Sequence, residues 1–140
     1  MKLARLHVLV ADDNPVNRRV LIGLLTIFGY TGVAVGDGVA ALTCLSKHPF
    51  DVVLMDVLMP NMDGFEALKT IRAQEKTQGG HLPIIMVTAH ADRIDQFKYQ
   101  QAGADGFVSK PIEIEKLRSE FNRLFDRPHE TFTKNKGIVV

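Results

Sequence analysis

Five side chains of this 140-residue chain could together form an acidic ion-binding site with one basic partner. Asp12 and Asp13 are consecutive, and Asp56 closes an apolar run. Thr88 closes another apolar run, and Lys110 precedes a proline. Carboxylates are hard oxygen ligands for divalent cations, a hydroxyl can donate or accept a hydrogen bond, and an ammonium pairs with anions. These residues are far apart in the sequence, so they can act together only where the fold brings them to one place.

Each of these residues stands at the end of a segment with the character of a buried strand. Apolar runs occupy residues 6–12, 51–56, 83–89 and 106–110, and a weaker run occupies residues 30–35. Strands that are apolar throughout are typical of a parallel sheet covered on both faces. The carboxyl ends of parallel strands share one edge of the sheet, and ligands bind there. This edge is therefore predicted to collect the three aspartates, the threonine and the lysine.

Stretches with helical periodicity separate the strands. Asn14 is a predicted N-cap with Pro15 at the first helical position, and Gly29 is predicted to end that helix. Asp63, with Glu66 three residues later, resembles a capping box. The predicted helices span about residues 15–28, 37–48, 63–76, 91–102 and 114–125. Alternating strands and helices without an internal repeat predict a single α/β domain with a doubly wound parallel sheet.

The composition limits the classes of partner. Lys and Arg total 17 and Asp and Glu total 16, which gives a net charge of +1. This balance gives no reason to expect a nucleic acid or a membrane surface as a partner. Cys44 is the single cysteine, so no disulfide can form within the chain. No apolar run approaches the roughly 20 residues of a membrane span. We therefore expect no direct nucleic-acid partner and no membrane contact by this chain.

Three carboxylates at one sheet edge need compensation. Two like charges about 4 Å apart interact by roughly 4 kcal/mol at an effective dielectric near 20. Either one carboxyl is protonated, or cations are present. Lys110 supplies one positive charge, and a hard divalent cation would supply the rest. Because the strand-end donors are oxygens without histidine or cysteine, Mg²⁺ or Mn²⁺ is favoured over Zn²⁺.

In this order and at these strand ends, the motifs resemble the receiver domain of two-component response regulators. The resemblance covers about residues 5–126 and is strongest to receivers of hybrid histidine kinases and phosphorelays. Its elements are Asp12-Asp13, "LMDVLMPNMDG" around Asp56, Thr88-Ala89, Lys110-Pro111, and Phe107 three residues before the lysine. It implies a flavodoxin-like (βα)5 fold with strand order 2-1-3-4-5. We expect one receiver domain at residues 1–126, followed at 127–140 by a poorly ordered tail or linker stub.

The resemblance also implies which residues act. Asp56 would accept a phosphoryl group from a phosphohistidine on a partner protein. Mg²⁺ (or Mn²⁺) would be held by Asp12, Asp13, Asp56 and the backbone carbonyl of Leu58. Lys110 would contact a phosphoryl oxygen. A cis peptide bond is implied between Lys110 and Pro111.

A conformational switch is implied as well. Thr88 would turn its hydroxyl onto another phosphoryl oxygen, and Phe107 would turn inward as Thr88 moves. The surface of the fourth helix, fifth strand and fifth helix would change as a result. That surface could support a phosphorylation-dependent homodimer.

The implied partner is a histidine kinase or a histidine phosphotransfer protein, and the implied location is the cytoplasm, including the cytoplasmic part of a membrane-bound kinase. The domain itself would catalyse only its own phosphorylation and dephosphorylation. Two contexts stay open: the receiver of a hybrid histidine kinase, which the motifs favour, and a stand-alone single-domain response regulator. The segment "DRIDQFKYQQ" fits an interface and a plain surface equally.

Three other functions are weighed against this one. A flavin-binding electron carrier of the same topology needs a phosphate loop after the first strand, where this chain has Asp-Asp-Asn-Pro. An aspartyl-phosphate hydrolase needs an acid two residues after the nucleophile, where this chain has Leu58. A degenerate receiver would lack part of the acid, threonine and lysine set. Leu58 is expected to shield the site from water, whereas His90 could lie over the mouth of the site but is assigned to an exposed loop. Arg18 and Arg19 are assigned to a solvated helix face that could also contact a partner.

Overall fold

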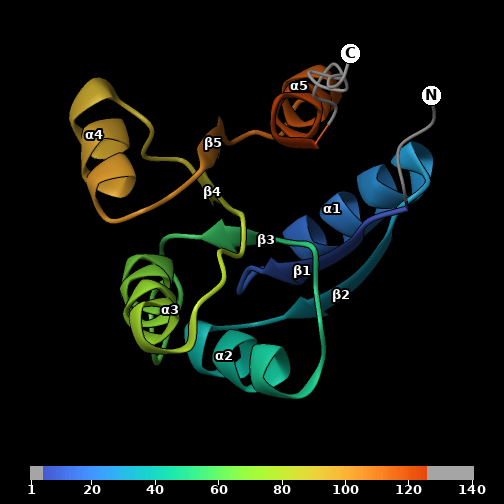
Figure 1. The fold of residues 1–140 in the computed structure, drawn as a ribbon. Helices are drawn as coiled ribbons and strands as arrows, with labels where there is room; N and C mark the ends of the chain where they lie inside the picture. Colours follow the sequence, from blue (N-terminus) through green and yellow to red (C-terminus); the bar gives the residue numbers. More distant parts are fainter. Residues whose placement is uncertain (1–4, 126–140) are drawn as a thin grey trace, which may run out of the picture.

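The computed structural model describes residues 5–125, which form a five-stranded parallel sheet with helices on both faces. The strand order is β2-β1-β3-β4-β5, as predicted (Figure 1). The predicted tail at residues 127–140 lies outside the described residues. Within residues 5–125, none of the helices combines the length and hydrophobicity that crossing a membrane requires.

The elements alternate along the whole described chain. The strands are β1 (His7–Ala11), β2 (Thr31–Val35), β3 (Val52–Asp56), β4 (Ile84–Thr88) and β5 (Gly106–Ser109). The helices are α1 (Pro15–Phe28), α2 (Gly38–Lys47), α3 (Gly64–Gln78), α4 (Arg93–Gln101) and α5 (Ile114–Phe125). All five predicted strands and all five predicted helices are present, with boundaries that differ by a few residues.

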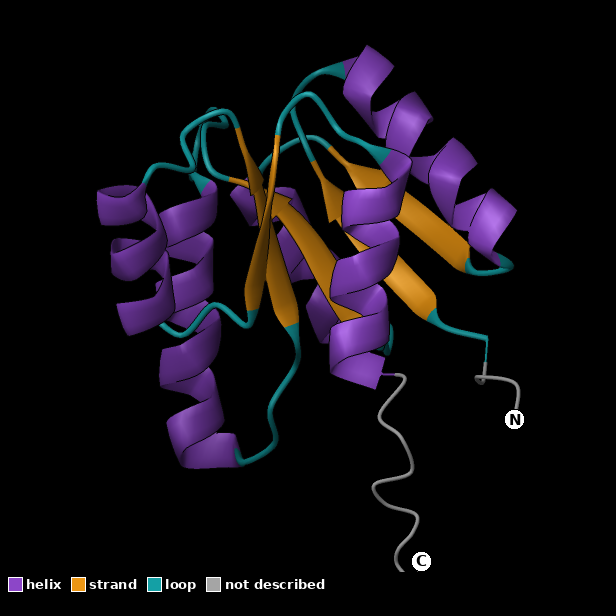
Figure 2. Ribbon diagram, turned by 90° about the horizontal axis from the view of Figure 1, so that it is seen from above, coloured by secondary structure: helices purple, strands orange, loops and turns teal. Residues whose placement is uncertain are grey.

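The sheet divides the core into two layers, which the view from above shows as helices flanking a central sheet (Figure 2). On one face, α1 and α5 pack through Leu21, Leu25 and Phe121 against alternate strand residues. On the other face, α2, α3 and α4 contribute residues such as Leu68 and Tyr99. Every residue of β3 and β4 is buried, which explains why these strands are apolar up to their last residues, Asp56 and Thr88.

Side chains cap most of the helices, and the caps set the helix boundaries. The Asn14 side chain accepts hydrogen bonds from the backbone N–H groups of Val16 and Asn17, which begins α1 at Pro15 as predicted. α4 begins two residues later than predicted because the Asp92 side chain caps it. α1 ends at Gly29, whose φ of 85° is the left-handed conformation that glycine adopts without strain.

The strand register brings the predicted site residues to one edge of the sheet. Ala11 pairs with Met55, so the next residue of each strand, Asp12 after β1 and Asp56 in β3, lies at the same edge of the sheet. Asp56 pairs with Val87, and Thr88 pairs with Ser109, which directly precedes Lys110. The carboxyl ends of four adjacent strands therefore carry the polar residues, while the interior of the sheet stays apolar.

Candidate functional site

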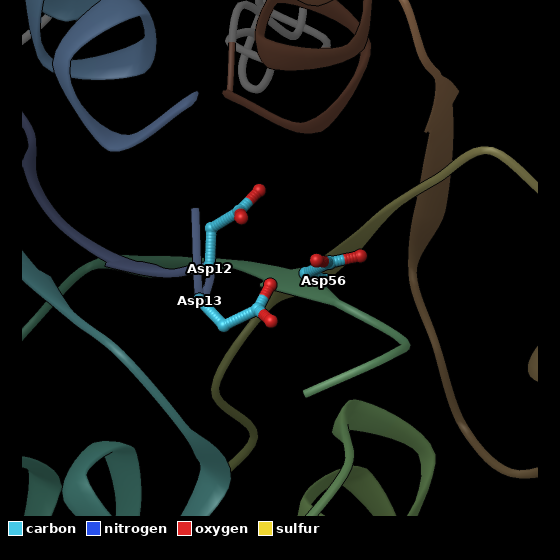
Figure 3. Close-up of side chains that lie close together, drawn as sticks. All are labelled: Asp12, Asp13 and Asp56. Atoms are coloured by element: carbon cyan, nitrogen blue, oxygen red, sulfur yellow. The ribbon is translucent and has the colours of Figure 1, made fainter. Parts of the chain in front are cut away.

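Three aspartates gather where β1 and β3 end. One carboxylate oxygen from each of Asp12, Asp13 and Asp56 lies within 4.8 Å of the others. Figure 3 shows the three side chains standing close together, Asp12 and Asp13 at the end of β1 and Asp56 at the end of β3. Asp12 and Asp56 are buried, whereas Asp13 is exposed. Two of these carboxylates therefore have little access to the water that would normally screen them.

Asp12 is fixed by its own loop through one oxygen, and its other oxygen pairs with Lys110. Its Oδ1 accepts a hydrogen bond of 2.9 Å from the backbone N–H of Asn14. Its Oδ2 is buried and accepts no hydrogen bond within residues 5–125. The Lys110 ammonium lies 3.0 Å from Oδ2 as an ion-pair partner. A buried carboxylate oxygen in this condition is suited to receive a further cation.

Lys110 also pairs with Asp56. Its Nζ lies 3.1 Å from Asp56 Oδ2. Burial alone would lower the pKa of Lys110, but its contacts with Asp12 and Asp56 outweigh burial and raise that pKa. The lysine is therefore a fixed positive charge at the site.

One ammonium does not satisfy the three acids. Burial raises the pKa of Asp56, Lys110 opposes the rise, and the neighbouring charges of Asp12 and Asp13 add to it. The ionised form of Asp56 is therefore less stable in the folded protein than the ionised form of a carboxyl group in water. A bound cation would offset this excess of negative charge.

The loop after Asp56 depends on close backbone packing at Gly64. The Gly64 N–H donates to the carbonyl of Val57 at 2.7 Å, which folds the loop back on the strand end. A Cβ added at Gly64 would collide with the carbonyl oxygen of Asp56. Glycine is thus required here because the backbone of α3 touches the backbone of the acidic site. Asn61 takes the left-handed conformation in the same loop, with a φ of 69°.

Thr88 is buried at the end of β4 and is already hydrogen-bonded. Its Oγ1 accepts the backbone N–H of His90 at 2.9 Å. The carbonyl of His90 in turn accepts the phenol hydroxyl of Tyr99 at 2.9 Å. Phe107 is half-buried, and its ring lies 6.2 Å from the Tyr99 ring, centroid to centroid. Thr88 is therefore connected to Phe107 through His90 and Tyr99, and this connection does not pass through the acids.

The mouth of the site is partly apolar. Leu58 is 59% exposed, two residues beyond Asp56. Leu58 and the exposed His90 both line a cavity of about 320 Å³ that extends between α3 and α4. Val57, which directly follows Asp56, lines the same cavity, so the cavity lies beside the loop that leaves β3.

The structure brings together Asp12, Asp13, Asp56 and Lys110, and it places Thr88 at the end of the neighbouring strand. The bond between Lys110 and Pro111 is cis, as the resemblance implied. Sequence analysis was wrong about Arg18, which it assigned to a solvated face. Arg18 is half-buried and its Nη1 donates to the Asp12 carbonyl at 2.7 Å. Sequence analysis also missed Tyr99, for which the weak apolar periodicity of α4 gave no signal.

The unfavourable charge on Asp56 leads to a prediction about the stability of the fold. A carboxyl whose pKa is raised in the folded state stabilises the fold when protonated, and that contribution is lost as pH rises through its folded pKa. In the presence of chelator at neutral pH, we expect Asp56→Asn to raise the melting temperature by about 3–5 °C, or roughly 1 kcal/mol. The difference from wild type should shrink as pH is lowered. Thermal denaturation followed by circular dichroism measures it.

Asp13→Asn is the matched control, because its carboxylate is exposed and loses less solvation on folding. It should raise the melting temperature by less than Asp56→Asn does. A melting temperature of Asp56→Asn at or below that of wild type would contradict the charge imbalance.

Comparison with known proteins identifies the family. Residues 8–122 match the model of the response regulator receiver domain. The chain is 36% identical to histidine kinase 3 of Arabidopsis thaliana, over 89% of this chain and 14% of the kinase. It is 37% identical to the chemotaxis protein CheY-3 of Vibrio cholerae, over 87% of this chain and 93% of that protein. The chain spans only 8 to 14% of the first histidine kinases it matches.

Solved structures agree with the sequence comparison. The receiver domain of the sensor histidine kinase PA1611 from Pseudomonas aeruginosa superposes with a TM-score of 0.75 at 35% identity, over 86% of this chain and 97% of that chain. That structure holds a magnesium ion in its active-site cleft. The family match covers most of the chain, and the strand order is the one expected of that family. The chain belongs to the response regulator receiver domain family.

Proposed function

We propose that this receiver domain is switched by phosphorylation of Asp56, which takes a phosphoryl group from a phosphohistidine on a partner protein. The observation that carries the proposal is the position of Asp56. It is a buried carboxylate at a strand end, 3.1 Å from the Lys110 ammonium and within a cluster of three acids. A rigid strand positions the nucleophile, and positioning together with charge neutralisation accounts for most of the catalysis of phosphoryl transfer.

The proposed reaction needs no general base. A carboxylate oxygen of Asp56 attacks the phosphorus, and the new P–O bond forms as the P–N bond to the partner's imidazole breaks. The electron pair of the broken bond stays on the imidazole nitrogen, and because the other ring nitrogen of the phosphohistidine carries a proton, the ring leaves as neutral imidazole. Burial raises the pKa of the Asp56 carboxyl from an ordinary value that is acidic. In its ionised form Asp56 is already the nucleophile, so no other residue has to remove a proton from it.

Mg²⁺, or Mn²⁺ in its place, fits the acid cluster. Asp12, Asp13, Asp56 and the backbone carbonyl of Leu58 would hold it, and the buried, unbonded Oδ2 of Asp12 supports this assignment. When bound, the cation would neutralise charge on the phosphoryl oxygens. The magnesium ion in the PA1611 receiver supports the choice of metal.

Lys110 and Thr88 have separate proposed roles around the phosphoryl group. Lys110 would exchange part of its ion pairing with Asp56 for a contact with a phosphoryl oxygen. Thr88 would leave the His90 amide and donate its hydroxyl to another oxygen. Phe107 would turn inward, which would change the surface formed by α4, β5 and α5 and could allow a phosphorylation-dependent homodimer.

The context that we favour is the receiver of a hybrid histidine kinase in a phosphorelay, with a cytoplasmic location. Histidine kinases among the relatives support it, and the CheY-3 relative keeps a stand-alone regulator as the alternative. The partner would be a histidine kinase or a histidine phosphotransfer protein. The domain would occupy residues 1–126 and catalyse only its own phosphorylation and dephosphorylation.

Incubation with a small-molecule phosphodonor and Mg²⁺ tests the proposal. Intact-mass spectrometry should show one phosphoryl group on the wild type and none after addition of chelator. Asp56→Asn should remain unmodified because it lacks the nucleophile.

Asp51→Asn is the matched control, since Asp51 lies at the opposite end of β3 and accepts the backbone N–H of His7. It should be modified like the wild type. A phosphoryl group that persists on Asp56→Asn would place the acceptor elsewhere and contradict the proposal.

The exposed apolar side chain of Leu58 leads to a prediction about the lifetime of the phosphorylated form. We infer that it limits the access of water to the phosphorylated Asp56, because it lines the cavity beside the site. Leu58→Asn should shorten the lifetime of the phosphorylated form by about three- to tenfold, which corresponds to a change of roughly 1 kcal/mol in the barrier. Loss of the phosphoryl group is followed by intact mass after removal of the phosphodonor.

Ile94→Asn is the control, because Ile94 is 79% exposed on α4 and does not line that cavity. Its phosphorylated form should last as long as that of the wild type. An unchanged lifetime in Leu58→Asn would show that Leu58 does not shield the site.

A further inference from the structure

A short chain of hydrogen bonds joins Thr88 to the inner face of α4. The Thr88 hydroxyl accepts the backbone N–H of His90, and the backbone carbonyl of His90 accepts the phenol hydroxyl of Tyr99, both at 2.9 Å. Thr88 and Tyr99 are 1% and 3% exposed, so water competes little for these bonds. The peptide unit of His90 is thereby held between a side chain of β4 and a side chain of α4.

The ring of Tyr99 lies among the elements that the proposed switch would move. Its centroid is 6.3 Å from that of Phe65 in α3 and 6.2 Å from that of Phe107 in β5. Tyr99 therefore contacts the aromatic residue proposed to turn inward and, through His90, the threonine proposed to turn toward the phosphoryl group.

The phenol hydroxyl stabilises the arrangement seen here. Burial raises the pKa of Tyr99, and the adjacent Thr88 hydroxyl partly opposes the rise, so the phenol is neutral and acts as a donor. A buried hydroxyl is costly without an acceptor, and the acceptor here belongs to the loop that follows Thr88. Moving Thr88 to the site removes the acceptor of the His90 amide and disturbs the peptide unit that Tyr99 holds.

We propose that Tyr99 is a positioning residue that holds Thr88 and the His90 peptide in the unphosphorylated arrangement. Its hydroxyl bond to His90 must be weakened before Thr88 can reach a phosphoryl oxygen. The strength of this hydrogen bond therefore determines how much of the phosphoryl group's binding energy is consumed by the conformational change. This inference rests on the proposed function, because it assumes that Thr88 moves toward the Asp56 site.

Tyr99→Phe tests the inference because it removes the hydroxyl and keeps the ring that packs on Phe65 and Phe107. The probe is beryllofluoride with Mg²⁺, a stable mimic of a phosphoryl group on a carboxylate. Losing one hydrogen bond of the unphosphorylated arrangement should tighten beryllofluoride binding by about three- to tenfold. Titration followed by ¹⁹F and backbone-amide NMR on the 140-residue chain gives the affinity. In the free variant, the His90 and Phe107 amide signals should shift toward their beryllofluoride-bound positions.

Two further variants separate positioning from packing. Tyr30→Phe makes the same chemical change in the opposite layer, where Tyr30 packs against Phe121, and should leave the affinity unchanged. Thr88→Val removes the hydroxyl through which Tyr99 acts. In that background, Tyr99→Phe should change the affinity by less than about twofold, since the two residues are coupled.

The outcomes are distinct. Unchanged or weaker beryllofluoride binding by Tyr99→Phe would overturn the inference while leaving phosphorylation of Asp56 intact. An equal gain in the Thr88→Val background would also overturn it, because Tyr99 would then act independently of Thr88. Failure of the wild type to bind beryllofluoride with Mg²⁺ would contradict the proposed function, and the inference would fall with it.

Discussion

The negative charge that four parallel strands deliver to one sheet edge is the constraint on which the rest of the structure depends. Three carboxylates meet there, and within residues 5–125 Lys110 is the one cation paired with the two buried ones. Burial raises the pKa of Asp56 and leaves one Asp12 oxygen without a hydrogen bond within the described chain. The fold keeps this arrangement because the two core layers stabilise the strands independently of the charges. This electrostatic imbalance favours a bound cation at the acid cluster.

The elements around this edge hold the acids without neutralising them. Gly64 lets α3 approach the Asp56 carbonyl, and Arg18 fixes the Asp12 backbone rather than its carboxylate. On the other side of Asp56, the contacts of Thr88 lead away from the acids, through His90 to Tyr99. The same edge therefore contains an acidic half, made by β1 and β3, and a half at β4 whose hydrogen bonds lead to α4.

The sequence predicted the strands and the strand-end acids because these depend on local patterns: apolar runs, caps and the parallel-sheet rule. The strand order followed from the family resemblance. It could not predict Tyr99. In α4 the apolar residues Ile94 and Phe97 are 79% and 63% exposed, whereas Tyr99 is buried, so periodicity did not indicate the inner face. The contact of Arg18 with the Asp12 carbonyl likewise depends on how α1 lies beside the end of β1. Such features follow from how a helix is rotated against the sheet, which a single sequence does not specify.

The most direct test of the charge imbalance is the affinity for Mg²⁺, measured by calorimetric titration of the wild type, Asp13→Asn and Lys110→Met. The account predicts saturable binding of one ion by the wild type. Asp13→Asn should weaken it by about tenfold or more through the loss of a carboxylate ligand, and Lys110→Met should tighten it because a competing positive charge is removed. Absence of saturable binding by the wild type, or weaker binding by Lys110→Met, would contradict the account.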